Sequence, residues 1–456
     1  MSKNIYLSRA GSWRRSWSFV AAATGATVGL GNLWKFSYLA GENGGAAFVL
    51  AYLLCVLLVA MPVMIAEVLL GSRGRSNPVT TMQDVSFEAG VSRGWQLIGW
   101  LGFVAGLLVL SYYSVIAGWS LAYIDKMFSG EFSAASAQLA GEGFNKLLSS
   151  PTQLMQWQGG FLAIVFLVVA AGVRRGISVV TRFLLPVLLL ILVALAIYAS
   201  RVGDLDAALA FLFTPDFSAL NKQVFLDALG HAFFTLSIGV GAMLTYGAYV
   251  PDQRSITGMV SVVVLMDTLV SLLAGLAIFP LVFSLNMAPA MGPGLMFVAV
   301  PYGFGNMLYG SYFGALFFVV VSIAAITSGV ALLEPATSWL VGRFRWWRPL
   351  AALAMVLLVW SLGLLTVFSF NIWQGFQLLG MSLFSLLDFI TANILLPMGG
   401  VLIAIFVGWR MRREVLRDEL YAESDKVFSL WYWLLRYIAA PGVALVFLSS
   451  LYQYWR

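Results

Sequence analysis

Eleven apolar stretches, spread over the whole chain, constrain its fold more than any other feature. They cover residues 16–39, 46–70, 96–124, 159–173, 179–200, 224–249, 257–285, 311–341, 350–369, 376–409 and 429–452. A helix that spans a membrane needs about 20 mostly apolar residues, and these stretches lack the period-2 alternation of membrane β-strands. We therefore predict an all-α polytopic membrane protein with about 11 transmembrane helices.

The amount and the placement of charge agree with a membrane protein. Only 10% of the 456 residues are charged, whereas a soluble domain carries about 25%. With the N-terminus in the cytoplasm, 19 of the 26 Lys and Arg residues fall on the cytoplasmic side, as the positive-inside rule requires. Eleven crossings then place the C-terminus outside, and Arg436, near the start of the last stretch, stays unassigned. We expect a bacterial inner membrane protein.

Two connections between the stretches stand out. The segment 173–176 (VRRG) alone separates the fourth and fifth stretches, so we predict a tight turn there. Residues 290–308 are rich in Gly and Pro and too broken to span a membrane. We predict a surface or re-entrant loop for them.

Several kinds of chemistry are excluded by composition. The chain has one cysteine, Cys55, and one histidine, His231, which excludes an intrachain disulfide and a multi-histidine metal centre. No nucleophile–base pair is visible, so we expect neither an enzyme nor an organic cofactor. The net charge of +6 follows from membrane topology, and we expect no binding of nucleic acid.

Two of the apolar stretches carry a Gly-x-Gly sequence in their middle. The first reads TGATVGLGN over residues 24–32, and the sixth reads FFTLSIGVG over residues 233–241. Each begins a block of five stretches, and paired interruptions of this kind mark midplane transport sites, although glycine pairs also permit close helix packing. We predict a single membrane transport domain over 1–456, with a first repeat at 16–200, a second, inverted repeat at 224–409 and an eleventh helix at 429–452.

Broken helices of this kind suit a zwitterion bound beside a small cation. Freed carbonyl oxygens bind hard cations, and amides at half-helix N-termini bind a carboxylate. Thr27, Asn32, Thr235 and Ser237 add side-chain oxygens next to the two interruptions. Asp267 stands alone in an apolar run, which favours ion binding because an unpaired carboxylate there is costly.

Three motifs resemble a known family. The sequence GATVGLGN at residues 25–32, followed by LWKF and GENGG, resembles the first-helix signature of the neurotransmitter:sodium symporter family. FFTLSIGVG at 233–241 with TYGAY at 245–249 resembles the sixth helix of that family, and AAITS at 324–328 resembles the eighth. The resemblance runs from about residue 13 to the end. It implies the 5+5 inverted-repeat fold of bacterial hydrophobic amino-acid transporters of the leucine-transporter type, with helices 1 and 6 unwound.

The same resemblance implies a set of binding residues. A central amino-acid site would use Thr27, Leu30, Gly31, Val109, Tyr113, Phe234, Thr235, Ser237, Val240, Ser328 and Leu332. A first sodium ion would be bound by Thr27, Asn32, Thr235 and Asp267. A second sodium ion would be bound by Gly25, Val28, Ala324, Thr327 and Ser328. The gates would involve Lys35, Asp388 and Trp13.

Individual positions refine what the resemblance implies about substrate and ions. Gly29 stands where carriers of monoamines have Asp, which implies an α-amino acid, and the small Val240 favours a large hydrophobic or aromatic side chain. Asp267 replaces the usual Asn and would supply the negative charge that makes chloride unnecessary. His231 either pairs with Asp267 when protonated or is a neutral, hydrogen-bonded core residue.

The gate positions differ from the family pattern, and two carboxylates within the apolar stretches need a role. Lys35 replaces the usual Arg of the outer gate, and Ala10 and Gly342 replace the usual Arg–Asp pair of the inner gate. The usual inner salt bridge is therefore not expected. Glu67 and Glu334 are expected either to hydrogen-bond to neighbouring helices or to act directly in function.

These observations lead to one main expectation of function. We expect a sodium-coupled symporter of hydrophobic and aromatic α-amino acids that works by alternating access without chloride. A proton-coupled transporter or exchanger on the same fold, and a non-transporting amino-acid sensor, remain open alternatives. The expected partners are two sodium ions, a small amino acid and membrane lipid, and the protein is expected to be a monomer or a weak homodimer.

Overall fold

Helices account for nearly all of the chain. The computed structural model describes residue 13 and residues 16–251, 254–287 and 294–454. Over these ranges there is no strand, and the only β-type pairing is an isolated bridge between Leu378 and Met381. Nine helices in the described ranges are long and apolar enough to cross a membrane, and two further crossings are interrupted. The predicted all-α fold with about 11 crossings is confirmed.

The first five crossings occupy residues 16–202. They consist of α1 (Ser16–Thr27) with η1 (Gly31–Lys35) and α2 (Phe36–Glu42); α3 (Ala46–Cys55) with η2 (Val56–Ala60) and α4 (Met61–Gly74); η3 (Arg93–Gln96) with α6 (Leu97–Phe128); α8 (Pro151–Ala170); and η4 (Val173–Ile177) with α9 (Ser178–Val202). Two shorter helices, α5 (Pro78–Glu88) and α7 (Ala137–Leu148), connect them.

The next five crossings begin at residue 222, after α10 (Leu205–Phe213) and η5 (Phe217–Ala219). They are α11 (Lys222–Thr235) with α12 (Ala242–Gly247); α13 (Ile256–Ser284); α15 (Gly310–Phe344); α16 (Arg348–Ser369); and α17 (Leu383–Phe389) with η7 (Ile390–Leu395), α18 (Leu396–Ile405) and η8 (Phe406–Arg410). Between α13 and α15 lie η6 (Leu295–Ala299) and α14 (Val300–Gly305). The eleventh crossing follows α19 (Arg413–Glu419) and combines α20 (Asp425–Leu434), η9 (Leu435–Ala439) and α21 (Ala440–Tyr454).

Two predicted connections were wrong in detail. The turn between the fourth and fifth crossings lies at residues 171–172, where Gly172 has a φ of 86°, and the predicted turn residues 173–176 instead begin the fifth crossing. A left-handed residue is needed at this reversal, and glycine supplies it without steric cost. The described part of the predicted loop 290–308 forms η6 and α14, whose apolar side chains, such as Phe297 and Phe304, are buried. It is therefore not a surface loop, and the re-entrant alternative stays a prediction.

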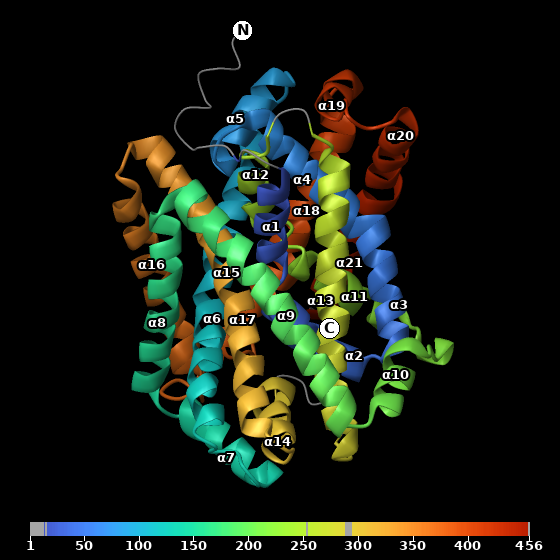
Figure 1. The fold of residues 1–456 in the computed structure, drawn as a ribbon. Coiled ribbons are helices and arrows are strands. Elements are labelled where there is room, and N and C mark those ends of the chain that lie inside the picture. The colour runs from blue at the N-terminus through green and yellow to red at the C-terminus, as the bar shows by residue number, and fades with distance from the viewer. Residues whose placement is uncertain (1–12, 14–15, 252–253, 288–293, 455–456) are drawn as a thin grey trace.

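The crossings that carry the interruptions pack against the most buried helices. Figure 1 shows α6 and α15 running through the bundle beside α1, with α8 and α16 on its outside. The connecting helices α5 and α19 lie at one end of the bundle, together with α20 at the start of the eleventh crossing, and α7, α10 and α14 lie at the other end (Figure 1). A side chain at Gly106 of α6 would approach the carbonyl oxygens of Val240 and Leu332 to 3.1 and 3.3 Å. Because Gly106 has no side chain, the third, sixth and eighth crossings approach one another closely at this point.

The interruption of the first crossing is short. Helix α1 continues through Thr27, and only Val28 and Gly29 leave helical geometry before the backbone resumes in a π-helical turn, η1. The amide of Gly29 donates to Asn32 Oδ1 (2.9 Å) instead of to a carbonyl of the preceding turn. Within the motif 24–32 the break thus covers only two residues, and Asn32 supplies the hydrogen bond that the Gly29 amide lacks from the backbone.

The interruption of the sixth crossing covers residues 236–241. Positive φ values occur at Ser237 (52°), Gly239 (81°) and Gly241 (74°). Glycine adopts this region without a Cβ penalty, so Gly239 and Gly241 allow the bend that leads from α11 into α12. Ser237 is held there by its hydroxyl, which donates to the carbonyl oxygen of Ala26 (3.0 Å). The interruption of the sixth crossing is thus hydrogen-bonded to the last turn of α1.

Candidate functional site

A cavity lies between the two interruptions. The free space inside it is about 30 Å³, far below the roughly 300–1,000 Å³ of occupied small-molecule sites, so the lining side chains nearly fill it in this conformation. Fourteen residues line it: Ala26, Thr27, Gly29, Leu30, Gly31, Val109, Tyr113, Phe234, Thr235, Ser237, Val240, Ser328, Leu332 and Leu396. The structure thus brings together all eleven residues that the resemblance implied for the amino acid. It adds Ala26, Gly29 and Leu396.

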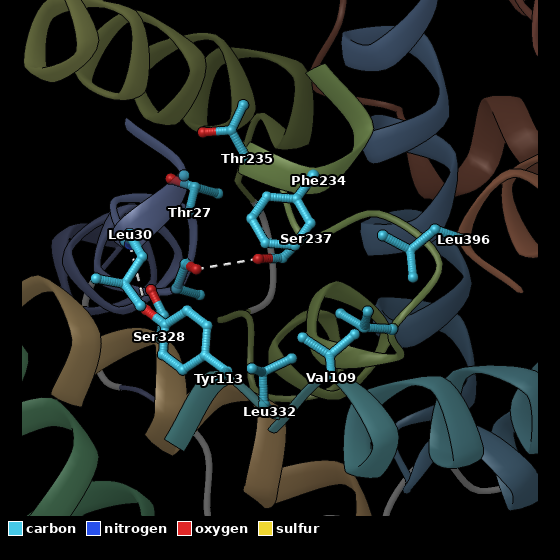
Figure 2. A pocket seen from close by; sticks show the side chains of 14 residues that line it. Thr27, Leu30, Val109, Tyr113, Phe234, Thr235, Ser237, Ser328, Leu332 and Leu396 are labelled. Carbon is cyan, nitrogen blue, oxygen red and sulfur yellow. Dashed lines mark hydrogen bonds between the residues drawn. The ribbon is translucent and has the colours of Figure 1, made fainter. Parts of the chain in front are cut away.

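One end of the cavity is polar. Figure 2 shows Thr27, Ser328 and the hydroxyl of Tyr113 on this side. The Tyr113 hydroxyl accepts a hydrogen bond from the backbone amide of Leu30 (3.3 Å). A Cβ at Gly29 would lie 2.6 Å from Ser328 Oγ and 3.0 Å from the Tyr113 hydroxyl. This end therefore presents backbone amides and a phenol at a point where only glycine leaves room for a small group.

The opposite end of the cavity is apolar. Figure 2 shows Val109, Leu332 and Leu396 on this side, with the ring of Phe234 between the two ends. Sequence reasoning missed Leu396, which comes from the tenth crossing. Its place depends on Gly239, where a Cβ would lie 2.8 Å from the Leu396 carbonyl oxygen. No local pattern around residue 396 signals this contact.

A cluster of oxygen atoms surrounds Asp267 beside the polar end. The carboxylate is fully buried and accepts hydrogen bonds from Asn32 Nδ2 (2.8 Å), the Tyr52 hydroxyl (3.0 Å) and Thr235 Oγ1 (3.0 Å). The predicted first-sodium residues Asn32, Thr235 and Asp267 are therefore in direct contact, and Thr27 lines the adjoining cavity. Tyr52 is an additional partner that sequence reasoning missed. Such a set of hard oxygen donors suits an alkali cation.

A second cluster of oxygen atoms joins α1 to α15. Ser328 Oγ donates to the carbonyl oxygens of Gly25 (3.3 Å) and Val28 (3.2 Å). Thr327 Oγ1 donates to the carbonyl oxygen of Ala324 (3.0 Å). All five residues of the predicted second sodium site thus lie together. Because Gly25 and Val28 belong to the first crossing and Ala324, Thr327 and Ser328 to the eighth, a cation bound here would link the two crossings.

The predicted outer-gate residues do not form an ion pair. In the described part of the chain no salt bridge joins Lys35 to Asp388. The Lys35 ammonium lies 4.6 Å from the centroid of the Phe234 ring instead. Lysine lacks the planar fork that favours a bidentate pair with a carboxylate. Lys35 therefore contacts the aromatic ring that lines the cavity.

Trp13, the predicted inner-gate residue, is buried in an aromatic cluster. Its ring lies 5.9, 5.5 and 5.6 Å from the rings of Phe19, Tyr246 and Tyr249, each in edge-to-face geometry. Its backbone amide donates to the carbonyl oxygen of Tyr249 (3.0 Å). Trp13 therefore attaches the start of the first crossing to the end of the sixth.

The two other buried carboxylates hydrogen-bond to neighbouring crossings, which was one of the two predicted outcomes. Glu67 Oε2 accepts from the amide of Gly239 (3.1 Å) within the sixth-crossing interruption. Glu334 accepts from the Tyr249 hydroxyl (2.9 Å) and forms an ion pair with Arg348. Sequence reasoning missed the ion pair because Arg348 belongs to the following helix and looked like a loop residue.

His231 fits neither predicted arrangement. Its ring lies among Phe36, Phe48 and Tyr52, with centroid distances of 5.9, 6.0 and 5.2 Å. Within the described residues neither ring nitrogen has a hydrogen-bond partner. Tyr52 hydrogen-bonds to Asp267 while it contacts His231, so His231 meets that carboxylate only through Tyr52.

Comparisons with known proteins cover the whole bundle. A family model described as the sodium:neurotransmitter symporter family matches residues 10–146 and 142–456. The sodium-dependent transporter YhdH of Bacillus subtilis is 36% identical over 440 residues, which are 96% of this chain and 97% of the relative. Sodium-dependent nutrient amino acid transporter 1 of Drosophila grimshawi is 24% identical over 92% of this chain and 73% of its own length.

A solved structure is also similar along its full length. The crystal structure of MhsT in complex with L-phenylalanine superimposes with a TM-score of 0.89 and 38% sequence identity. The match covers 96% of this chain and 99% of that chain. The similarity therefore includes the arrangement of the crossings as well as their sequence.

Proposed function

Because the chain belongs to the sodium:neurotransmitter symporter family, we propose that it moves hydrophobic and aromatic α-amino acids together with sodium ions across a bacterial inner membrane. The observation that carries this proposal is that both interruptions line one cavity that has a polar and an apolar end. The N-terminus lies in the cytoplasm in this proposal, and transport proceeds by alternating access.

The polar end of the cavity provides for both charges of an α-amino acid. The carboxylate binds the amides of Leu30 and Gly31 and the hydroxyl of Tyr113, since amides at the start of a helical segment attract an anion. The ammonium group binds the carbonyls of Thr27, Phe234 and Thr235. Gly29 suits this arrangement because any side chain there would enter the carboxylate position.

The apolar end selects the side chain of the amino acid. Val109, Val240, Leu332 and Leu396 present only aliphatic surface to the cavity. No charged side chain lines the cavity in the described part of the chain. A substrate with a charged side chain would therefore lose the hydration of that side chain without compensation. The bound L-phenylalanine of MhsT, which shares this fold, supports an aromatic or large aliphatic substrate. Phe234 closes the site over the substrate.

Two sodium ions couple transport to the ion gradient in this proposal. The first binds at Thr27, Asn32, Thr235 and Asp267, next to the substrate carboxylate, so that ion and amino acid stabilise each other. The second binds at the carbonyls of Gly25, Val28 and Ala324 and the hydroxyls of Thr327 and Ser328. It holds α1 against α15 and thereby favours the state that accepts substrate, because coupling requires differential affinity.

The available energy is sufficient for concentrative uptake. One charge that crosses 100 mV releases about 2.3 kcal/mol, and a tenfold concentration ratio adds about 1.4 kcal/mol. Two sodium ions therefore supply roughly 7 kcal/mol. Since tenfold corresponds to about 1.4 kcal/mol, this supports a gradient of about 10⁵ for a zwitterion.

Asp267 removes the need for chloride in this proposal. A sodium ion bound in a low-dielectric interior requires a nearby negative charge. The buried Asp267 carboxylate provides one that is already oriented by Asn32, Tyr52 and Thr235. A free anion at this position would be repelled by that carboxylate.

The proposal is tested by binding of radiolabelled amino acids to the purified protein in sodium, potassium or choline salts at one fixed pH. We expect saturable binding of phenylalanine or leucine in sodium only, with glutamate and lysine unable to compete. Binding that is equal in all three salts but changes with pH would support the proton-coupled alternative instead. Uptake into proteoliposomes separates a transporter from a sensor, since a sensor would bind without accumulation.

A further inference from the structure

Arg436 is a cation inside the eleventh crossing that transport does not use. It lies in η9, and its side chain packs against Gly408 of the neighbouring tenth crossing. A Cβ at Gly408 would lie 3.0 Å from Arg436 Cγ. No salt bridge in the described part of the chain involves Arg436. An unpaired arginine within a membrane protein requires an explanation.

Three aromatic rings surround the Arg436 guanidinium. Its central carbon lies 5.1 Å from the Trp409 ring, 5.5 Å from the Tyr432 ring and 5.6 Å from the Tyr437 ring. We call these four residues the arginine cage. Rings stack against the faces of a guanidinium, whereas its N–H groups point outward in its plane. The cage therefore stabilises the charge and leaves most of the donors without acceptors.

The hydrogen bonds of the guanidinium confirm this shortage of acceptors. Arg436 Nη1 donates to the Tyr432 hydroxyl (3.2 Å). Arg436 Nε is shielded from solvent and has no acceptor among the described residues. Tyr432 itself is engaged, since its hydroxyl donates to the carbonyl oxygen of Gly408 (3.1 Å). Since Nε is shielded, an acceptor from outside the chain can complete the site only at the Nη1 and Nη2 edge, where the one hydrogen bond among the described residues is that to Tyr432.

The position of the cage defines the surroundings from which that acceptor comes. Trp409 and Arg410 are the last two residues of the tenth crossing, so the cage lies level with the end of that crossing. The side chains of Trp409 and Tyr437 are about half exposed on the outside of the bundle. An exposed Trp at the end of a crossing, such as Trp409, is typical of the membrane–water interface, and Tyr437 of the eleventh crossing lies beside the same guanidinium. The cage therefore faces lipid headgroups.

Charge and position together identify the ligand. We propose that the arginine cage binds the phosphodiester of an anionic phospholipid, such as phosphatidylglycerol, in the leaflet next to α19 and α20. An arginine fork forms paired hydrogen bonds with phosphate oxygens, and the lipid glycerol and chains lie along the exposed faces of Trp409 and Tyr437. The exposed Arg410, Arg412 and Arg413 at the same end raise the local concentration of anionic lipid.

Native mass spectrometry of the purified protein tests this site. Equal amounts of phosphatidylglycerol and phosphatidylcholine are added to the wild type and to Arg436→Gln, Arg436→Lys and Arg343→Gln. Arg343 is the matched control because it is an exposed arginine at the end of α15, on another crossing. We expect the wild type and R343Q to retain one phosphatidylglycerol about tenfold more strongly than R436Q, with R436K in between because lysine keeps the charge but lacks the fork.

Several results would overturn the proposal. Equal retention of phosphatidylglycerol by wild type and R436Q would show that the cage does not bind it. Equal retention of both lipids by the wild type would show that the cage does not select an anionic lipid. A dimer mass that is lost in R436Q would show that the cage binds a second copy of the chain instead. If inorganic phosphate raised the unfolding temperature of the wild type as much as phosphatidylglycerol does, the cage would be a site for a free anion. Should R436Q fail to elute as a single species, the ratio of R436K to wild type decides the question.

Discussion

Three residues set the chemistry of the cavity by what they accept or exclude. Gly29 leaves space beside Ser328 and Tyr113, Asp267 brings a fixed negative charge, and Leu396 completes the apolar wall. The first two were predicted from the sequence because each departs from the residue that related carriers have. Leu396 was not, because the contact that places it depends on how the tenth crossing approaches Gly239.

Replacement of Gly29 by alanine is predicted to weaken amino-acid binding. A Cβ at this position would lie 2.6 Å from Ser328 Oγ, and overpacking of this kind costs about 1–3 kcal/mol. We expect about tenfold weaker binding of phenylalanine in sodium, measured by equilibrium binding. Gly141→Ala in α7 is the control, since nothing lies within 4 Å of its Cβ position. Unchanged affinity in G29A would contradict the assigned carboxylate position.

Replacement of Asp267 by asparagine is predicted to create a chloride requirement. The variant loses the charge that balances the first sodium ion while it keeps a side chain able to contact Asn32 and Thr235. We expect sodium-dependent binding of D267N to fall by about tenfold in gluconate salts and to recover in chloride, whereas the wild type is equal in both. Chloride stimulation of the wild type would refute the charge argument.

Among the structural elements, the two interrupted crossings are the ones that sequence reasoning described best. The glycines of SIGVG signal the second break directly, because Gly239 and Gly241 adopt positive φ, whereas in GATVGLGN only Gly29 falls within the break. The length of the first break did not follow from the motif, since Asn32 supplies a hydrogen bond that the motif alone does not reveal. For the segment 290–308 the sequence left a surface and a re-entrant loop open, because its glycines and prolines interrupt the apolar pattern. Only the surface alternative was wrong, since Leu295–Gly305 is helical and largely buried.

Arg348 is predicted to hold the inner end of the bundle closed. It forms an ion pair with the buried Glu334, which also accepts from Tyr249 of the sixth crossing, and its Nε donates to the carbonyl oxygen of Val169 (2.8 Å). Removal of one partner of a buried pair costs about 3–5 kcal/mol. In R348Q we therefore expect faster labelling of a cysteine placed at Ala26, in the cavity, by a reagent added on the side of α19.

The labelling experiment has a simple background and control. Cys55 is the single cysteine and is buried, so a Cys55→Ser protein carries only the introduced thiol. Arg343→Gln removes an exposed arginine from the end of α15, the helix that carries Glu334, and should label at the original rate. An R348Q protein that labels no faster than R343Q would exclude this ion pair from inner closure.

At the scale of the whole molecule, eleven crossings and the family followed from hydropathy and three motifs. What the sequence did not reveal are contacts between distant segments, such as Lys35 over Phe234 in place of a pair with Asp388, or Arg348 with Glu334. Such pairs depend on the final packing of separate crossings. The bounds of the two repeats, 16–200 and 224–409, and the roles of the ion-binding residues stay predictions.

Sodium is predicted to stabilise the whole bundle. Both sodium clusters link crossings from different parts of the chain, so an ion that binds only the folded state adds its binding free energy to the free energy of unfolding. At a sodium concentration 100 times the dissociation constant this amounts to about 2.7 kcal/mol. We expect a higher unfolding temperature in sodium than in choline, and a smaller difference in Thr327→Ala. Equal unfolding temperatures in both salts would argue against bound sodium.

The contact of Gly239 with Leu396 bears on inhibitor design. One wall of the cavity belongs to the tenth crossing, and it abuts the backbone bend of the sixth. An amino-acid analogue with an oversized side chain would hold the sixth and tenth crossings apart. In the proposed function, this would prevent the alternating-access step that releases the substrate. Such compounds should act as competitive inhibitors of amino-acid binding. A larger residue at position 396, at the apolar end of the cavity, should likewise turn a substrate of the proposed symporter into an inhibitor.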